Sequence, residues 1–413
     1  MICPSGCFYR AFARIFTTPF IVFTTLNKSR IILGHSYWGR GGAEVAAMWV
    51  LQALCEEYLV DIVTRGGWDL DDLNRCSGTN VQATSLGRVI TPSLVPGFYV
   101  MGGALWHGLY LRRCRHVCRP YDLRITASRT LDWGLPAIHF LSDVAWNLPL
   151  QRRFGCPEAL QFANLLRRAY FRVGKWLAGN SGRDPAAHDV FVANSQWCAR
   201  IAAEFCRQPP QVIYPAVPDG ATINKWEQRE SSFLCLGRIS PEKRIEQVIA
   251  TLDQVRTLGH PIRLHLVGTG DDANYLRQVQ RLGAARDWVV FHGAVFGPEK
   301  QALLSRCRYG ISACDREAFG IATAEMVKAG IIPFVPQTGA QCEIVEEDAL
   351  IFGDIQDAAL KIDAVLNSES RQLELHAAML RRGEQFDSVQ FCEAVRELVR
   401  HELNTKPAGT IVI

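Results

Sequence analysis

Several features that mark particular classes of protein are missing from this 413-residue sequence. It has no low-complexity tract and no internal repeat, which argues against fibrous and solenoid architectures. No compact run of Lys and Arg with interleaved aromatic residues is present, so nucleic acid is not an expected partner. No Asp-x-Asp motif stands at the carboxyl end of an expected strand, so we expect no bound metal.

Metal-site and disulfide spacings are also missing, although the sequence has 14 cysteines. The closest pairs, Cys3/Cys7 and Cys114/Cys118, have no matching histidine or second pair, as a zinc site would need. Most of the others lie in apolar runs such as "FLCLG", where cysteine behaves as a small hydrophobic residue. We therefore expect a reducing, cytoplasmic compartment.

One apolar stretch near the amino terminus resembles a targeting signal. Arg10 and Arg14 precede it, and it runs from Ile15 to Leu26. No Ala-x-Ala-like cleavage site follows, and the stretch is too short to span a bilayer. We expect residues 1–29 to form an extension that contacts a membrane or is disordered, and an early start codon would explain the segment equally well.

The remaining composition is typical of a globular protein with two domains. Hydrophobic residues make up 48% and charged residues 21% of the chain, and its length exceeds what one hydrophobic core usually holds. The net charge of +4 is uneven, since 23 Lys and Arg accompany 15 Asp and Glu through residue 220, whereas the remainder has 22 and 26. A basic N-terminal half and an acidic C-terminal half fit separate domains with different partners.

Apolar runs alternate with helical stretches, which predicts parallel sheets in an α/β fold. The expected strands are "RIILG", "LVDIVT", "DLRIT", "PAIHFL" and "DVFVANS", then "SFLCLG", "IRLHLVG", "WVVFHG", "YGISA", "IIPFVP" and "ALIFGD". The proline-rich segment 209–220 suits a linker between the two series. We expect two Rossmann-like, doubly wound domains that face a cleft: 30–212 and 213–385, with 386–413 as a helix and tail that packs back on the first.

Charged side chains follow the strands of the second domain. Arg238 comes directly after a strand and Lys243 stands five residues later, at the expected start of a helix. Two cations there suit a diphosphate, although a solvated strand–helix loop would hold the same residues. "LVGTGDDA" matches a dinucleotide fingerprint, but its aspartates oppose a pyrophosphate, so we interpret it as a tight turn and disfavour a nicotinamide dehydrogenase.

The stretch "REAFGIATAEMVKAG" keeps two glutamates eight positions apart, a spacing that does not share one helical face. Gly320 is expected to open a helix, so that backbone N–H groups there receive phosphate. Glu317 would lie just outside the helix and Glu325 about 7–8 Å along its axis. One acid would then reach a sugar and the other a ribose, while a helix-terminal acid plus an incidental exposed glutamate is the alternative.

Together these residues resemble family 4 of the retaining glycosyltransferases, which have the two-domain GT-B fold. Glu317 and Glu325 match its Glu-x7-Glu pair, and Gly237, Arg238 and Lys243 match its strand–Gly-Arg loop and following lysine. "RGGAE" matches its Gly-Gly loop, "AIHFLSD" supplies a cleft-facing histidine, His139, and "VANSQWCARI" is similar to its Asn-Ser segment. The likeness covers most of residues 30–400 and is densest from 233 to 353.

The resemblance implies a role for each matching residue. Arg238 and Lys243 would bind the donor diphosphate, with help from the backbone of Gly320 and Ile321. Glu325 would hold the ribose hydroxyls, and Glu317 would face the donor sugar. In the first domain, Gly41 and Gly42 would let their loop approach the donor, and His139 would contact the donor sugar near the reaction centre.

This chain departs from the family pattern at three places. Ala340 replaces the second of two glycines, Arg244 replaces the glycine after the lysine, and Ala313-Cys314 replaces Pro-Ser. None of these changes removes a charged group. The family expectation therefore remains transfer of a sugar from a nucleotide-diphosphate sugar, with retention, without metal or other cofactor. The alternatives are a nucleotide-sugar epimerase of the same fold and a catalytically degenerate nucleotide-sugar-binding protein.

A basic helix is expected in the first domain and bears on the acceptor. Residues 158–179 place Phe, Leu, Tyr and Val three and four apart, with Arg and Lys on the other side. Such a helix can lie on an anionic bilayer, or it can pack on the domain with a solvated basic face. By the resemblance, the acceptor would be a glycan or a lipid-linked sugar in polysaccharide or glycolipid biosynthesis. The protein would then contact the cytoplasmic face of a membrane through 158–179 and the extension.

Overall fold

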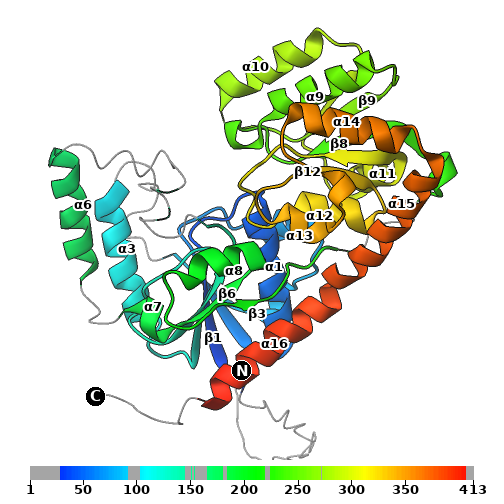
Figure 1. Ribbon diagram of the computed structural model, residues 1–413. Coiled ribbons are helices and arrows are strands. Elements are labelled where there is room, and N and C mark those ends of the chain that lie inside the picture. Colours follow the sequence, from blue (N-terminus) through cyan, green and yellow to red (C-terminus); the bar gives the residue numbers. More distant parts are fainter. Residues whose placement is uncertain are drawn as a thin grey trace, which may run out of the picture.

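The computed structural model describes residues 28–91, 103–144, 165–179, 184–218, 224–270 and 272–405, together with Leu150 and Arg153. Figure 1 shows two α/β bodies, joined by the chain between their sheets and by a long C-terminal helix. Every neighbouring strand pair in both sheets is parallel. The prediction of two Rossmann-like parallel-sheet domains is therefore confirmed. Nearly all of the expected extension, residues 158–164 and Asp271 lie outside the described residues.

The first sheet has seven strands in the order β3-β2-β1-β4-β5-β6-β7. Their bounds are β1 Arg30–Gly34, β2 Leu59–Val63, β3 Leu86–Ile90, β4 Leu123–Thr126, β5 Ala137–Leu141, β6 Val190–Ala193 and β7 Gln211–Val212. Successive strand side chains point to opposite faces, so Ile31 and Leu33 pack in one core whereas Ile32 packs in another. Helices cover both faces of this sheet.

The helices of the first body are α1 Gly42–Cys55, α2 Leu70–Ser77, α3 Gly103–Val117, α6 Leu165–Ala178, α7 Pro185–His188 and α8 Gln196–Ala203. Helices α3 and α6 stand side by side at one edge (Figure 1). Their backbones meet at two glycines, because a Cβ added to Gly108 would lie 2.1 Å from the carbonyl oxygen of Gly174. This close approach holds the basic helix α6 against the rest of the domain.

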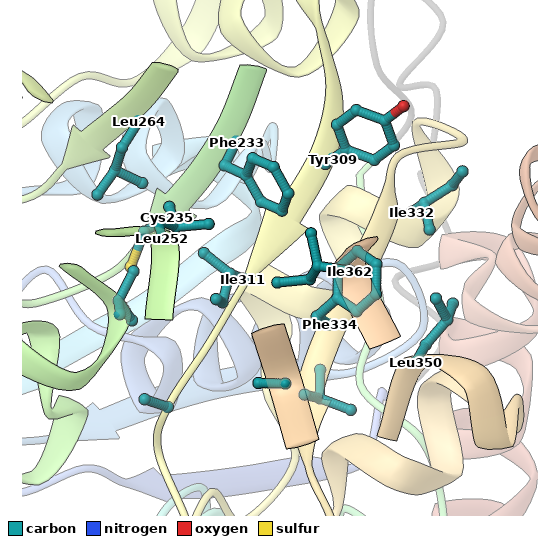
Figure 2. Close-up of a cluster of buried hydrophobic side chains, with 14 of the residues drawn as sticks. Phe233, Cys235, Leu252, Leu264, Tyr309, Ile311, Ile332, Phe334, Leu350 and Ile362 are labelled. Atoms are coloured by element: carbon teal, nitrogen blue, oxygen red, sulfur yellow. The ribbon is translucent and has the colours of Figure 1, made fainter. Parts of the chain in front are cut away.

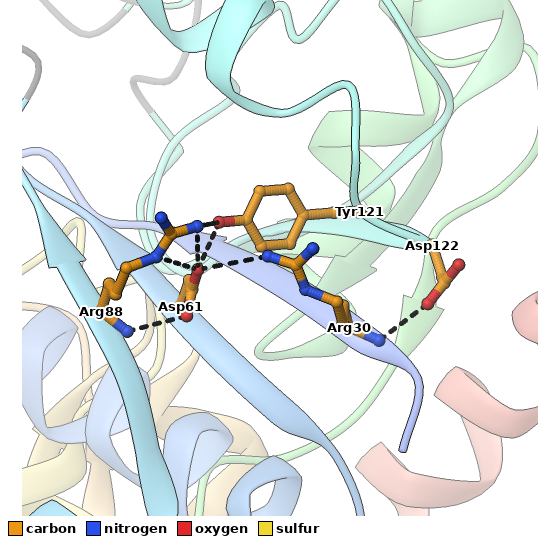
Figure 3. Close-up of polar contacts among 5 residues, drawn as sticks. All are labelled: Arg30, Asp61, Arg88, Tyr121 and Asp122. Atoms are coloured by element: carbon orange, nitrogen blue, oxygen red, sulfur yellow. Dashed lines mark hydrogen bonds and ion pairs between the residues drawn. The ribbon is translucent and has the colours of Figure 1, made fainter. Parts of the chain in front are cut away.

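Strand β3 was not predicted, because it is a mostly exposed edge strand, LGRVI, in which a glycine and an arginine interrupt the apolar residues. Its register depends on Asp61 of the neighbouring β2, whose buried carboxylate accepts from the Arg88 backbone N–H at 2.7 Å. Figure 3 shows the same carboxylate receiving the Tyr121 hydroxyl and the guanidinium groups of Arg88 and Arg30. Only glycine fits at position 87, because a Cβ there would lie 1.9 Å from Asp61 Oδ1.

The second sheet has six strands in the order β10-β9-β8-β11-β12-β13. Their bounds are β8 Glu230–Leu236, β9 Arg263–Val267, β10 Val289–Gly293, β11 Cys307–Ile311, β12 Ile332–Pro336 and β13 Ile351–Phe352. The helices are α9 Ile245–Thr257, α10 Ala273–Ala284, α11 Gly297–Arg306, α12 Ile321–Lys328, α13 Gln341–Val345, α14 Ile355–Leu366 and α15 Glu369–Gly383. Figure 2 shows the core between this sheet and its helices, where Phe233, Tyr309 and Phe334 pack around Ile362.

Short 3-10 turns lie at Ala83–Ser85, Trp226–Gln228, Pro241–Lys243, Asp348–Leu350 and Glu384–Phe386. The helix expected from Lys243 therefore starts two residues later, at Ile245. Pro241 at the head of the turn and a left-handed Arg244, with φ of 50°, separate the turn from the helix. Lys243 thus ends the 3-10 turn that follows β8, and it does not belong to the helix.

The last helix, α16, spans Ser388–Thr405 and leaves the second body to lie along α1 of the first (Figure 1). Phe391, Val395 and Val399 are buried in the first domain's core. Arg400 binds Glu57, which follows α1, with its Nε 3.0 Å from a carboxylate oxygen. The apolar face and this ion pair dock the C-terminal helix on the first domain. In the part of the chain that the structure describes, no helix is long and apolar enough to cross a membrane.

Candidate active site

The loops at the carboxyl ends of β8, β9 and β11 converge, as expected in parallel sheets. Two glycines of "LVGTGDDA" allow this packing. A Cβ at Gly268 would lie 1.8 Å from the Gly237 carbonyl oxygen, and one at Gly270 would lie 2.0 Å from that of Ile239. Asp272 caps α10 by accepting from Asn274 N at 2.9 Å. The interpretation of this motif as a tight turn is confirmed.

Lys243 and Glu317 form an ion pair at this end of the sheet. Their side chains are 23% and 22% exposed, so the pair is shielded from bulk water but remains reachable. Burial lowers the pKa of Lys243, but the Glu317 carboxylate more than offsets this and the net pKa is raised. Lys243 therefore remains a cation at neutral pH. The sequence predicted both residues in one site, and the structure brings them into contact.

Beside this pair lies a second one that the sequence did not indicate. Arg244 Nη2 lies 2.5 Å from Asp315 Oδ2. Arg244 occupies the place of the family's glycine and adopts the left-handed conformation that glycine adopts without strain. The Asp315 contact holds the arginine in that conformation and ties the β11 loop to the β8 loop.

Glu325 lies on α12 and pairs with Lys300 from α11, with 2.6 Å between Nζ and Oε1. Their side chains are only 14% and 10% exposed. Lys300 was not among the predicted site residues, because it precedes Glu325 by 25 positions and no local spacing relates them. The lysine fixes one carboxylate oxygen of Glu325 and compensates its charge.

Gly320 stands at the N-cap of α12 with φ of 102°, so the free N–H groups of the helix begin at Ile321. A Cβ at Gly320 would approach Glu317 Cγ to 3.3 Å and Gln341 Cγ to 3.0 Å. Glycine here thus allows Glu317 to lie beside the start of the helix. The Ala340 N–H also donates to the Glu317 carbonyl at 2.9 Å.

The other departures from the family pattern also fit the structure. Ala340 has φ of −85°, a conformation that any residue adopts, and it is fully buried. Cys314 is 4% exposed, and its carbonyl accepts from Gln341 Nε2 at 3.0 Å. Burial raises the pKa of the Cys314 thiol to about 11, so the thiol stays protonated at neutral pH. Neither residue introduces a charge or a clash.

The Gly-Gly loop of the first domain faces α12. Gly41 is the N-cap of α1 and Gly42 its first residue. A Cβ at Gly42 would lie 3.5 Å from Ile321 Cδ1, so the N-termini of α1 and α12 meet across the two domains. Arg238 follows β8 at the same end, is 57% exposed and contacts Glu242 at 3.3 Å. Gly42, Ile321, Lys243 and Glu317 thus belong to one interdomain site.

His139 does not belong to it. The prediction that this histidine faces the cleft is wrong, because it lies in the middle of β5 with no exposed surface. Its Nε2 lies 3.0 Å from Asp189 Oδ2, and its ring packs against Phe191. The alternation of strand side chains turns the ring into the domain. His139 and Asp189 form a buried structural pair.

Another histidine lies at the carboxyl end of β1, where the first sheet reverses its strand order. His35 is 3% exposed, and its Nε2 lies 3.5 Å from Glu44 Oε1. Burial raises the pKa of Glu44, whereas hydrogen bonding to His35 and the nearby Gly41 and Glu44 N–H groups lower it, with a net decrease. Glu44 is therefore an anion that supports the Gly-Gly loop. Among the described residues, no group of three His, Cys, Asp or Glu side chains could hold a metal ion.

Comparison with known proteins finds a family model and curated relatives that are similar to part of this chain. Residues 221–386 match the family model "Glycosyl transferases group 1". The relatives include uncharacterized glycosyltransferase YqgM of Bacillus subtilis, 25% identical over 139 residues, which are 33% of this chain and 39% of that protein. A second is GDP-Man:Man(3)GlcNAc(2)-PP-Dol alpha-1,2-mannosyltransferase of Dictyostelium discoideum, 25% identical over 208 residues, 44% of this chain and 40% of that one. The chain spans about two fifths of the length of these curated relatives.

Solved structures resemble the fold over nearly the whole chain. Anabaena Alr3699/HepE in complex with UDP and glucose has a TM-score of 0.65 at 15% identity, covering 90% of this chain and 100% of that one. Sucrose-phosphate synthase of Thermosynechococcus elongatus has a TM-score of 0.67 at 15% identity, covering 92% and 100%. WaaG, a glycosyltransferase involved in lipopolysaccharide biosynthesis, has a TM-score of 0.65 at 13% identity, covering 89% and 99%. The fold is GT-B.

Proposed function

We propose that this protein is a retaining, metal-independent glycosyltransferase that moves a sugar from a nucleotide-diphosphate sugar to a glycan or lipid-linked acceptor. One observation carries the proposal: Lys243, Glu317 and the N-terminus of α12 meet beside Gly42 of the other domain. A cation and a helix N-terminus at one point favour an anionic group. The family match over residues 221–386 and the UDP and glucose bound by Alr3699/HepE support a nucleotide sugar as that group.

Departure of the nucleoside diphosphate is the step that these residues would assist. As the glycosidic bond breaks, negative charge grows on the leaving phosphate, and Lys243, Arg238 and the Ile321 N–H would stabilise it. Glu317 would face the sugar, and Glu325 would accept hydrogen bonds from the ribose hydroxyls. The acceptor hydroxyl would attack on the face from which the diphosphate leaves, so the anomeric configuration is retained. Its proton would pass to the leaving phosphate.

A screen of the purified protein against UDP-, GDP- and ADP-sugars tests this proposal. Thermal shift reports binding, and release of the nucleoside diphosphate without added metal reports turnover. Binding at a hundredfold excess over Kd stabilises the fold by about 2.7 kcal/mol. We expect one nucleotide class to bind and Glu325→Gln to abolish the thermal shift. Glu299 is an exposed acid on α11, and Glu299→Gln should leave the shift unchanged.

The outcomes separate the rival functions. Folded protein that binds none of these donors contradicts the assignment of the site. Binding without turnover, with candidate acceptors present, favours a degenerate binding protein, and a changed sugar without acceptor favours an epimerase. NMR of the product decides retention, because the anomeric configuration of the new linkage must match that of the donor.

We further propose that α6 contacts an anionic membrane surface, so that the enzyme works at a cytoplasmic membrane face. Trp176 is 76% exposed and Val173 47% exposed, while Arg172 and Lys175 beside them are exposed as well. Exposed aromatic and cationic side chains on one helix favour a bilayer interface. The WaaG structure, from lipopolysaccharide biosynthesis, supports a lipid-borne acceptor.

Sedimentation with phosphatidylglycerol vesicles tests the membrane contact. Trp176→Ser should reduce the bound fraction severalfold, and 0.5 M salt should reduce it further because it screens the cations. Leu360→Ser, which removes another exposed apolar side chain, 55% exposed on α14, serves as the control. Equal binding of both variants contradicts the proposal.

A further inference from the structure

The first domain holds the segment that carries Glu317. Ser195, which follows β6, donates its hydroxyl to the carbonyl oxygen of Ala318 at 2.7 Å. Cys198 Sγ lies 3.2 Å from the same oxygen. Ser195 has no exposed surface, Cys198 is 2% exposed and Ala318 9%. The residue directly after Glu317 is therefore fixed by two buried side chains of the opposite domain.

A second contact joins α8, the helix that Ser195 caps, to the second domain. The carboxylate of Glu343, on α13, accepts from the backbone N–H groups of Gln196 at 2.8 Å and Trp197 at 2.6 Å. These are the first two N–H groups of α8, which no residue within a helix can satisfy. The negative charge also complements the positive end of the helix dipole. Arg382 holds Glu343 in place by donating to its carbonyl at 2.6 Å.

The backbone N–H groups at the start of α8 thus have hydrogen-bond partners in both domains. Cys198 N donates to Ser195 Oγ at 3.0 Å, and Ala199 N donates to Ser195 O at 2.9 Å, both within the first domain. The N–H groups of Gln196 and Trp197, in contrast, donate to Glu343 of the second domain. Separation would break these contacts between the domains, and the groups that make them would exchange those partners for water.

We propose that Ser195 and Glu343 are positioning residues that couple the contact between the domains to the placement of Glu317. Domain contact locks Ala318 and aligns Glu317 with the donor sugar, and separation releases both. This inference rests on the proposed function for the role of Glu317, whereas the mechanical coupling is independent of it. A purely structural junction would change stability alone and leave the Glu317 segment and the reaction rate unaffected.

Amide hydrogen exchange of the ligand-free protein tests the coupling directly. In Ser195→Ala we expect the amides from Ala318 to Ala322 to exchange roughly five- to tenfold faster, the effect of one lost hydrogen bond. Ser195→Thr, which keeps the hydroxyl, should restore slow exchange. Arg400→Ala is the matched control, because it removes the contact of α16 with Glu57, which does not touch this segment. Unchanged exchange in Ser195→Ala, or equal acceleration in Arg400→Ala, overturns the proposal.

Kinetics with the donor found by the nucleotide-sugar screen supply the second readout. Ser195→Ala and Glu343→Gln should each lower kcat about tenfold while the Kd for the free nucleoside diphosphate stays within twofold, because the nucleotide contacts are intact. Equal loss of kcat and nucleotide affinity contradicts a positioning role. A wild-type protein that turns over no nucleotide sugar refutes the proposed function, and hydrogen exchange still decides the coupling.

Discussion

Lys243 and Glu317 are 74 positions apart in the sequence and form a part-buried ion pair between the loops after β8 and β11. Each is thus the other's charged partner. An incoming diphosphate would compete with the Glu317 carboxylate for the Lys243 ammonium group. This competition separates the two roles, since Lys243 would bind phosphate and Glu317 would act on the sugar.

Glu317→Gln should separate binding from turnover. Loss of the carboxylate frees Lys243, so the affinity for the nucleoside diphosphate should stay the same or rise up to severalfold. The release of product should fall at least 100-fold, as for the loss of a preorganised charged group. Calorimetric titration and a single-turnover assay measure the two quantities. Glu393→Gln, an exposed acid of α16, is the control, and a parallel loss of affinity in Glu317→Gln would contradict the competition.

Gly42→Ala should keep the fold and lose activity. Gly42 does not have a left-handed φ and begins α1, so alanine is tolerated and the free energy of unfolding should stay the same or rise by up to about 0.5 kcal/mol. Its methyl group would occupy the space 3.5 Å from Ile321 Cδ1, where the donor is expected, and turnover should fall at least tenfold. Gly259→Ala should show the reverse, about 1 kcal/mol of destabilisation from its φ of 102° with full activity. Urea denaturation and initial rates compare the variants.

Lys300→Met should weaken nucleotide binding through Glu325. Without the 2.6 Å contact, the Glu325 carboxylate loses both its orientation and its compensating charge. We expect about tenfold weaker binding of the ribonucleotide and a smaller preference for it over the 2′-deoxyribonucleotide, as measured by calorimetry. Lys225→Met, an exposed lysine of the same domain, should bind as wild type does. An undiminished preference for ribose would show that Lys300 does not position Glu325.

Acidification should destabilise the second domain through His265. Burial lowers the pKa of His265 from 6.5 to about 4, assisted by Arg306 and by His292, whose Nε2 lies 2.9 Å from His265 Nδ1. Between pH 6.5 and 4 the unfolded chain binds a proton that the folded one does not, so stability falls as the pH falls. From pH 7 to pH 5 the loss should be about 2 kcal/mol. His265→Gln should lack this loss in urea titrations, while His401→Gln, an exposed histidine of α16, should keep it.

Asp61→Asn should destabilise the first domain by about 2–3 kcal/mol. The 3% exposed carboxylate accepts from a backbone N–H and from Arg88, Tyr121 and Arg30, and the neutral amide cannot satisfy all of them (Figure 3). Glu230→Gln, whose pair with Arg306 is about half exposed on both sides, should cost less than about 0.5 kcal/mol. Equal effects in denaturant titrations would show that the Asp61 network adds nothing beyond a surface ion pair.

Local sequence pattern was enough to predict most strands, because fully buried parallel strands are continuous apolar runs. "RIILG", "PAIHFL" and "IIPFVP" were found in this way, and each forms a strand. The edge strand β3 has no such run and depends on Asp61 of its neighbour, so it was missed. Likewise, the short β7 lies at the start of the proline-rich segment that was interpreted as a linker.

In the candidate site, too, some residues could be predicted from local sequence and others could not. Glu317, Glu325, Arg238 and Lys243 were predicted because each stands at a fixed offset from a strand end or helix start, and parallel sheets bring such positions to one edge. His139 was misplaced because a motif does not state to which side of a strand a side chain points. Lys300, Ser195 and Glu343 were not predicted as site residues, since each acquires its role from a partner at least 25 positions away.

By itself, the sequence determined the two parallel sheets, the glycine turns and the chemical types of the groups at the strand ends, because these follow from local periodicity and backbone preference. Only the tertiary structure decided which charges pair, which histidine is buried and how one domain holds the loop of the other. Those properties depend on distances between residues far apart in the chain, and the packing of α8 against the Glu317 segment sets them.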